Sequence, residues 1–268
     1  MSATANGSVN GGGEAATGGL SRRGPRILVA VPVYNEQRYI TNVIAKIAEY
    51  APNDVLVVDD GSTDATPTLL AHQPVDVIRH KTNLGYGRAI RDAFRWAQSY
   101  GYDWLITMDC DEQHEPESLP DFVAAIERDD SDVISGSRYL VDCAECVKPP
   151  ADRQKINAEV TRWINESLGL AITDAFCGFK AYRVSATADL DLDVDGYAIP
   201  LQAWVQHAAA DHRVSEVPIR LIYNDPNRSF GGKLDDADER LRHYREVFRR
   251  EMVKHPQLRG GCASCAAG

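Results

Sequence analysis

From Arg26 onward the chain alternates short apolar runs, rich in β-branched residues, with segments of helical periodicity. In the first of these segments Ile40, Val43, Ile44 and Ile47 recur at helical spacing. This alternation predicts an α/β fold with a mainly parallel central sheet and helices on both faces. Ligands of such sheets bind beyond the carboxyl ends of the strands. The apolar runs are RILVAVPVY, VLVVDD, VDVIRH, WLITM and DVISGS.

The second half is less regular. We expect a helix over residues 153–168, a loop over TDAFCGFKAYRV that leads into a strand, and a strand over RVSEVPIRLIY. A last helix over 236–254 carries an apolar stripe with basic residues between its members. This basic face either packs on the core with a solvated exterior, which we favour, or meets a membrane surface.

Composition limits the function classes. The chain has 268 residues, 44% hydrophobic and 25% charged, with a net charge of -10, which argues against nucleic-acid binding through a basic surface. No signal peptide and no apolar run of roughly 18 residues is evident, so we expect a cytoplasmic protein, with peripheral contact at the cytoplasmic membrane face as an option. We predict a disordered Gly/Ala/Ser-rich tail over 1–24, one domain over 25–255 and a flexible Cys/Gly-rich tail over 256–268.

The cysteines include two CxxC pairs, which suggest either a four-cysteine zinc site or free thiols. The pairs are far apart in the sequence, and the second lies in the Gly/Ala-rich tail, so free thiols are favoured. The six cysteines are Cys110, Cys143, Cys146, Cys177, Cys262 and Cys265.

Polar residues stand just past three of the predicted strands. Tyr34 and Glu36 follow the first, Asp60 the second, and Asp109 the fourth. Because the carboxyl ends of parallel strands share one edge of the sheet, we expect these side chains to converge on one cleft.

The segment DCDEQH places two carboxylates one residue apart. In an extended segment Asp109 and Asp111 point the same way and can face one hard cation, Mg²⁺ or Mn²⁺, to which Gln113 can add an amide oxygen or orient a water. Taken alone, the pattern fits a solvated acidic turn better.

Two further segments narrow the ligand class. In VVDDGSTD, Asp60 can accept from a nucleobase or a ribose hydroxyl, while Ser62 or Asp64 can cap the next helix. NLGYGRAI is neither a P-loop nor a GxGxxG fingerprint, which disfavours an NTPase or a dehydrogenase. Its glycines either let the backbone approach a nucleotide or pack under the cleft.

Taken in order, these segments resemble family 2 glycosyltransferases, in particular the dolichol-phosphate (polyprenyl-phosphate) mannose synthase-like enzymes. The resemblance covers about residues 26–233. The segments that carry it are PVYNE, VVDDGSTDAT, NLGYGRA, DCDEQH, GSRY and TDAFCGFKAYR.

The resemblance implies a GT-A (nucleotide-diphospho-sugar transferase) fold and inverting transfer of a hexose, with mannose from GDP-mannose favoured, to a polyprenyl phosphate. It also assigns residues to roles. The nucleotide-sugar would be bound by Pro32, Tyr34, Glu36, Asp60 and Asp109. The metal, Mg²⁺ or Mn²⁺, would be bound by Asp109, Asp111 and Gln113. The phosphates of donor or acceptor would be met by Arg138, Arg153, Lys180, Arg228 and Lys233.

A phosphate acceptor is already largely a dianion at neutral pH, so it needs cationic positioning more than deprotonation. Asp174 is the candidate base or positioning carboxylate; a structural Asp is the alternative. The acceptor half departs from the family pattern, for example with Lys180 where Arg is usual. A soluble acceptor (a metabolite, glycan or protein) and a nucleotide-sugar-binding protein with little turnover are therefore the alternatives.

Overall fold

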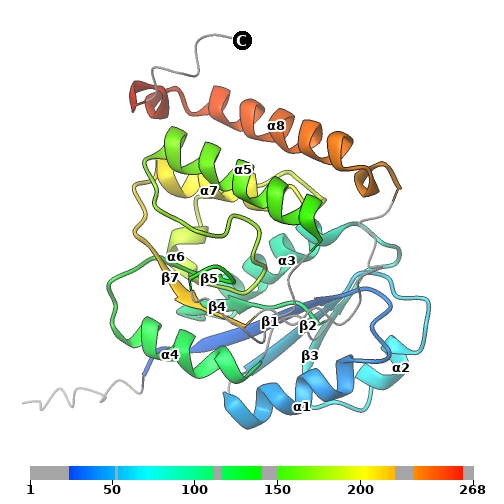
Figure 1. Ribbon diagram of the computed structural model, residues 1–268. Helices are drawn as coiled ribbons and strands as arrows, with labels where there is room; N and C mark the ends of the chain where they lie inside the picture. The colour runs from blue at the N-terminus through cyan, green and yellow to red at the C-terminus, as the bar shows by residue number, and fades with distance from the viewer. Residues whose placement is uncertain (1–23, 52–53, 111–115, 141–149, 221–231, 262–268) are drawn as a thin grey trace, which may run out of the picture.

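The computed structural model describes residues 24–51, 54–110, 116–140, 150–220 and 232–261. These residues form a seven-stranded sheet with helices on both faces, as the alternating pattern predicted (Figure 1). The strands are β1 (Ile27–Val33), β2 (Asp54–Asp59), β3 (Asp76–Arg79), β4 (Trp104–Thr107), β5 (Val133–Ser137), β6 (Lys180–Arg183) and β7 (Val214–Pro218). The helices are α1 (Ile40–Tyr50), α2 (Thr66–Leu70), α3 (Tyr86–Ser99), α4 (Leu119–Glu127), α5 (Ala151–Leu168), α6 (Val184–Thr187), α7 (Ile199–Ala209) and α8 (Ala237–Lys254), with 3-10 turns η1 (Pro116–Ser118), η2 (Gly232–Asp235) and η3 (Pro256–Gly261).

The strand order is β3-β2-β1-β4-β6-β5-β7. Strands β3, β2, β1 and β4 run parallel, and β5 is parallel to β7, whereas β6 is antiparallel to both of its neighbours. The order reverses between β1 and β4, which is where open α/β sheets bind ligands.

Each face of the sheet has its own core. Along β1 the side chains alternate: Val29 and Val31 pack with α1 and α4, while Leu28 and Ala30 pack with α3. Strand β1 is apolar throughout because both of its faces are covered. In Figure 1, α1 and α4 lie on one side of the sheet, and α5, α7 and α8 on the other.

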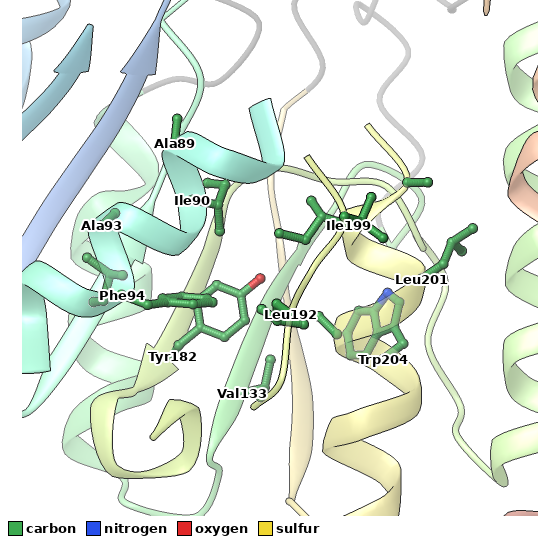
Figure 2. Close-up of a cluster of buried hydrophobic side chains, with 14 of the residues drawn as sticks. Ala89, Ile90, Ala93, Phe94, Val133, Tyr182, Leu192, Ile199, Leu201 and Trp204 are labelled. Carbon is green, nitrogen blue, oxygen red and sulfur yellow. The ribbon is translucent and has the colours of Figure 1, made fainter. Parts of the chain in front are cut away.

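The core beneath α3 and α7 is built from large aromatic and branched side chains. Phe94 of α3 meets Tyr182 of β6 edge to face, with the ring centroids 5.0 Å apart. Figure 2 shows this pair beside Leu192 and near Trp204 of α7. Trp204 is almost completely buried, and its ring nitrogen donates to the Ala175 carbonyl oxygen at 3.0 Å.

Helix α7 has no counterpart in the sequence-based expectations. Its sequence, IPLQAWVQHAA, is buried on nearly every side, so it has no polar stripe to reveal a helical period. Gln202 and Gln206 of α7 both donate to the buried carboxylate of Glu251, at 2.9 and 2.7 Å, and so fix α8 on the core. This contact agrees with the interpretation of α8 as a helix packed on the core.

Several expected features lie outside the described residues. Among them are the N-terminal tail up to residue 23 and both CxxC pairs. Residues 256–261, which we expected to be flexible, form η3, and Leu258 packs against the core. Among the described residues, no helix is long and apolar enough to cross a membrane.

Candidate functional site

A cavity of about 1020 Å³ opens at the carboxyl ends of the parallel strands. It is bounded by the segments that follow β1, β2 and β4 and by residues of α3, α5 and α8. The three polar strand tips therefore reach one space, although they are far apart in the sequence. The candidate residues that line the cavity are Pro32, Tyr34, Glu36, Asp60, Asp109, Arg138, Arg153 and Lys180.

Four candidates cannot be placed in this way. Asp111, Gln113 and Arg228 lie outside the described residues, as does the side chain of Lys233. Their assignments remain predictions that rest on the resemblance.

The tips of β1 and β2 are tied together by side-chain caps. Asn35 adopts a left-handed backbone, with φ of 59°, and its side-chain oxygen accepts from the Thr63 amide at 2.8 Å. Ser62 accepts from the Asn35 amide at 2.9 Å, and Asp64 accepts from the Thr66 amide at 2.9 Å at the start of α2. These bonds explain Ser62 and Asp64 structurally. Asp64 binds the amide of the first residue of α2, although the N-cap position itself is Ala65, which makes no side-chain cap.

Asp60 has a structural role that the sequence did not reveal. Its Oδ1 accepts from the Leu84 amide at 2.8 Å and lies 2.7 Å from Nδ1 of His80. Its Oδ2 accepts from the Gly85 amide at 2.8 Å. The carboxylate, 4% exposed, therefore holds the start of α3 in place while it lines the cavity. Its proposed contact with a nucleobase stays a prediction.

The glycines before and within α3 allow a close backbone approach under the cleft. Gly87 donates from its amide to the Asp195 carbonyl oxygen at 2.7 Å. A Cβ on Gly87 would lie 2.2 Å from the Val194 carbonyl oxygen, and one on Gly85 would lie 2.3 Å from that of Asp195. Of the two explanations for these glycines, the structure favours packing.

Gly87→Ala is therefore expected to destabilise the protein by about 1–3 kcal/mol, the usual cost of overpacking, because its methyl group meets a backbone atom. Denaturant unfolding measures this change. Gly196→Ala is the matched control, since a Cβ there meets nothing within 4 Å and the expected change is within about 0.5 kcal/mol. Equal stabilities for the two variants would contradict the close approach.

Asp109 follows β4 and is half-buried at the cavity wall. Its carboxylate is hydrogen-bonded by the Tyr86 hydroxyl and lies against Gly178, where a Cβ would come within 2.6 Å of Oδ2. A carboxylate in a polar cavity is the type of ligand that a hard divalent cation takes, so Asp109 fits the expected metal. The described residues contain no group of three potential metal-ligating side chains, and Asp111 and Gln113 are not among them.

Arg138 and Asp174 form the strongest ion pair of the site. Nε and one terminal nitrogen of Arg138 donate to the two carboxylate oxygens at 2.6 and 2.8 Å, and the Asn157 amide donates to Oδ1 at 3.0 Å. Burial disfavours the charged form of Asp174, but the charge and hydrogen bonds of Arg138 outweigh it and hold the carboxyl pKa below its ordinary value.

This arrangement bears on the roles considered for Asp174. Its side chain is fully buried, and it is not among the residues that line the cavity. A carboxylate with a lowered pKa, bonded on both oxygens, is a poor proton acceptor. This geometry disfavours a general base and fits a carboxylate that positions Arg138, and the role of Asp174 in the reaction stays a prediction.

Lys180 lines the cavity, and its ammonium is buried among groups of its own chain. The ammonium donates to Ser135 Oγ at 2.9 Å and to the Cys177 carbonyl oxygen, and it lies 5.1 Å from the Trp204 ring centroid. Burial lowers the pKa of Lys180. Because two of its protons are bonded to its own chain, Lys180 has less capacity for a phosphate than the resemblance implied.

Arg240 of α8 is a cavity residue that the sequence analysis missed. Only 3% exposed, it donates to Asp152 at 2.8 Å and to the Leu234 carbonyl oxygen at 2.9 Å. It stands four residues before Tyr244, on the side of α8 that packs inward, so a basic residue at an inward helical position was the available signal. It is one of four arginines that line the cavity, together with Arg38, Arg138 and Arg153.

Comparisons with known proteins agree with this geometry. The sequence profile of the Glycosyl transferase family 2 matches residues 28–191. The undecaprenyl-phosphate mannosyltransferase of Micrococcus luteus is 34% identical over 223 residues, which cover 79% of this chain and 90% of that protein. The polyprenol monophosphomannose synthase of Mycolicibacterium smegmatis is 31% identical over 204 residues, which cover 72% of this chain and 76% of that protein.

A solved structure shows the same fold. The glucosyl-3-phosphoglycerate synthase of Mycobacterium tuberculosis, crystallised with Mn²⁺, uridine diphosphate and phosphoglyceric acid, superimposes with a TM-score of 0.60 at 17% identity. The match covers 91% of this chain and 82% of that one. The GT-A fold implied by the sequence motifs is therefore confirmed. With a nucleotide-sugar type of fold, an acidic strand tip and four arginines around one cavity, this chain is a glycosyltransferase and belongs to family 2.

Proposed function

We propose that this chain is an inverting, metal-dependent glycosyltransferase that moves a hexose from a nucleoside diphosphate sugar to a polyprenyl phosphate. The observation that carries the proposal is one cavity lined both by Asp109 and by the arginines Arg138, Arg153 and Arg240. Mannose, with GDP-mannose as donor, is the favoured sugar, because two similar proteins are named as mannose-transferring enzymes that use undecaprenyl or polyprenol phosphates.

The arginines suit both substrates. As the sugar leaves the donor, negative charge builds on the departing nucleoside diphosphate, and fixed cations stabilise that charge. Arg138 is preorganised for this role, since Asp174 holds two of its nitrogens. The acceptor phosphate is a dianion at neutral pH, so its oxygen can attack the anomeric carbon without losing a proton to a base. Asp174 is then not required as a base.

A divalent cation, Mn²⁺ or Mg²⁺, bound at Asp109 with Asp111 and Gln113, would offset the charge of the donor diphosphate. The nucleoside would lie between the tips of β1 and β2, near Pro32, Tyr34, Glu36 and Asp60. Arg228 and Lys233 would complete the phosphate contacts. A lipid acceptor requires the cavity to meet a membrane surface, so we place the enzyme peripherally at the cytoplasmic membrane face.

The proposal is tested by incubating the protein with radiolabelled GDP-mannose, Mn²⁺ and a short polyprenyl phosphate. We expect a butanol-extractable glycolipid that disappears when EDTA removes the metal. UDP-glucose, UDP-N-acetylglucosamine and Mg²⁺ form the comparison arms. A soluble phosphate acceptor, 3-phosphoglycerate, is the competing acceptor, and turnover that depends on it and ignores the lipid would reject the lipid assignment.

A thermal-shift panel of nucleoside diphosphates identifies the donor base independently of turnover. A nucleotide present at 100 times its Kd stabilises the folded protein by about 2.7 kcal/mol, and the expected shift is largest for GDP with Mn²⁺. Equal shifts for all bases, or shifts that do not depend on Mn²⁺, would contradict the proposed donor and metal.

A further inference from the structure

Asp109, the described member of the proposed metal set, is restrained from two sides by its own chain. The hydroxyl of Tyr86, the first residue of α3, is hydrogen-bonded to the Asp109 carboxylate. Gly178 lies on another side, so close that a Cβ there would meet both carboxylate oxygens, at 2.6 and 2.9 Å. The carboxylate is thus confined to one orientation at the cavity wall.

The position of Tyr86 is itself fixed. The amides of Leu84 and Gly85, directly before it, are bound by the carboxylate of Asp60, at 2.8 Å each. The amide of Gly87, directly after it, donates to the Asp195 carbonyl oxygen at 2.7 Å. Its backbone is therefore bonded on both sides, and its hydroxyl has little freedom to leave Asp109.

The ring of Tyr86 is also held. It stacks on Tyr197, with centroids 5.6 Å apart and planes 19° from parallel. The stacking restrains the ring that carries the hydroxyl bonded to Asp109.

We infer that Tyr86 is a positioning residue: its hydroxyl, with Gly178 as the opposing wall, fixes the Asp109 carboxylate in the orientation that a divalent cation needs. The inference rests on the proposed metal-dependent transfer. Residues that hydrogen-bond to a metal ligand orient it, and their loss commonly weakens metal binding by about 10–100-fold. The segment from Leu84 to Gly87 also links the carboxylate of Asp60, proposed for the nucleoside, to the one proposed for the metal.

Tyr86→Phe removes the hydroxyl and keeps the ring that stacks on Tyr197. We expect the Kd for Mn²⁺, measured by electron paramagnetic resonance with and without GDP, to rise about 10-fold or more. The Mn²⁺ concentration that gives half-maximal turnover should rise in parallel, while turnover at saturating Mn²⁺ falls less.

Tyr102→Phe is the matched control. Tyr102 is buried and, like Tyr86, bonds to an aspartate through its hydroxyl, Asp54 at 2.8 Å, but it lies at the opposite end of the sheet. This variant should bind Mn²⁺ as the wild type does. A general loss of stability in either variant is read separately by denaturant unfolding.

Gly178→Ala tests the same orientation from the other side. Its backbone is outside the left-handed region, and the three nearest atoms that an added methyl group would meet all belong to the Asp109 carboxylate. We expect a comparable loss of Mn²⁺ affinity. If Tyr86→Phe does not fold, this variant alone tests whether the orientation of Asp109 controls Mn²⁺ binding.

The outcomes separate two failures. If the wild type binds Mn²⁺ and both Tyr86→Phe and Gly178→Ala bind it within about twofold of the wild type, the positioning role is wrong and the proposed function stands. If the wild type binds no Mn²⁺ even with a nucleoside diphosphate, the metal dependence of the proposed function fails, and the inference fails with it.

Discussion

Asp174→Asn is expected to destabilise the protein by about 3 kcal/mol, the lower end of the range for breaking a buried ion pair. The substitution keeps the size of the side chain but leaves the Arg138 guanidinium, bonded through two nitrogens, opposite a neutral amide. The cost stays at the lower end because the side chain of Arg138 is 17% exposed to the cavity and can be partly hydrated there. Urea unfolding of the full chain at pH 7 measures the change.

The pH dependence of this effect has a definite sign. The folded-state pKa of Asp174 is lowered, so the stabilising contribution is complete above the unfolded value of about 3.9 and is lost as the pH falls below it. The stability difference between wild type and Asp174→Asn should therefore shrink in acid. Asp130→Asn is the control, because Asp130 is an exposed partner of Arg128 at 3.5 Å, and the stability should change much less than in Asp174→Asn. A loss at Asp174 no larger than at Asp130 would refute the buried pair.

Asp109→Asn is expected to lower turnover by about 10³-fold, the scale at which loss of a preorganised electrostatic group is felt. Asn has the same shape as Asp but lacks the charge that a divalent cation needs. Folding should be largely retained, since Asp109 is half-buried beside the cavity. The measurement is glycolipid formation from labelled donor, over a titration of Mn²⁺.

Asp54→Asn serves as the control for this variant. Asp54 begins β2 at the amino end of the strand, away from the cavity, and should leave turnover unchanged even if its bond to Tyr102 weakens. Turnover of Asp109→Asn within tenfold of the wild type at saturating Mn²⁺ would contradict the role assigned to Asp109.

Much of the first half of the fold could be predicted because its elements carry strong local signals. The run RILVAVPVY is apolar throughout, since both faces of β1 are covered, and α1 shows its inward positions at helical spacing. Because these strands are parallel, the polar residues at their carboxyl ends lie along one edge of the sheet. The placement of Glu36, Asp60 and Asp109 around one cavity follows from that rule.

The second half could not be predicted in the same way. Strand β6 enters the sheet antiparallel between β4 and β5, and its four residues carry no mark of direction or neighbour. Helix α7 is buried on most sides and therefore lacks a period. Among the site residues, the ion pair of Asp174 was the hardest to predict, because a lone Asp in a loop does not indicate which arginine it will bind.

By itself, the sequence determined which residues stand at the ends of the strands and that carboxylates and arginines are available for a diphosphate. Local periodicity and strand direction suffice for this. Only the tertiary structure decided which of these charges are already bonded within the chain: Asp174 to Arg138, Lys180 to Ser135, Asp60 to the start of α3, and Asp109 to Tyr86. Such partners come from distant segments and depend on distances of a few ångströms, which no local pattern encodes.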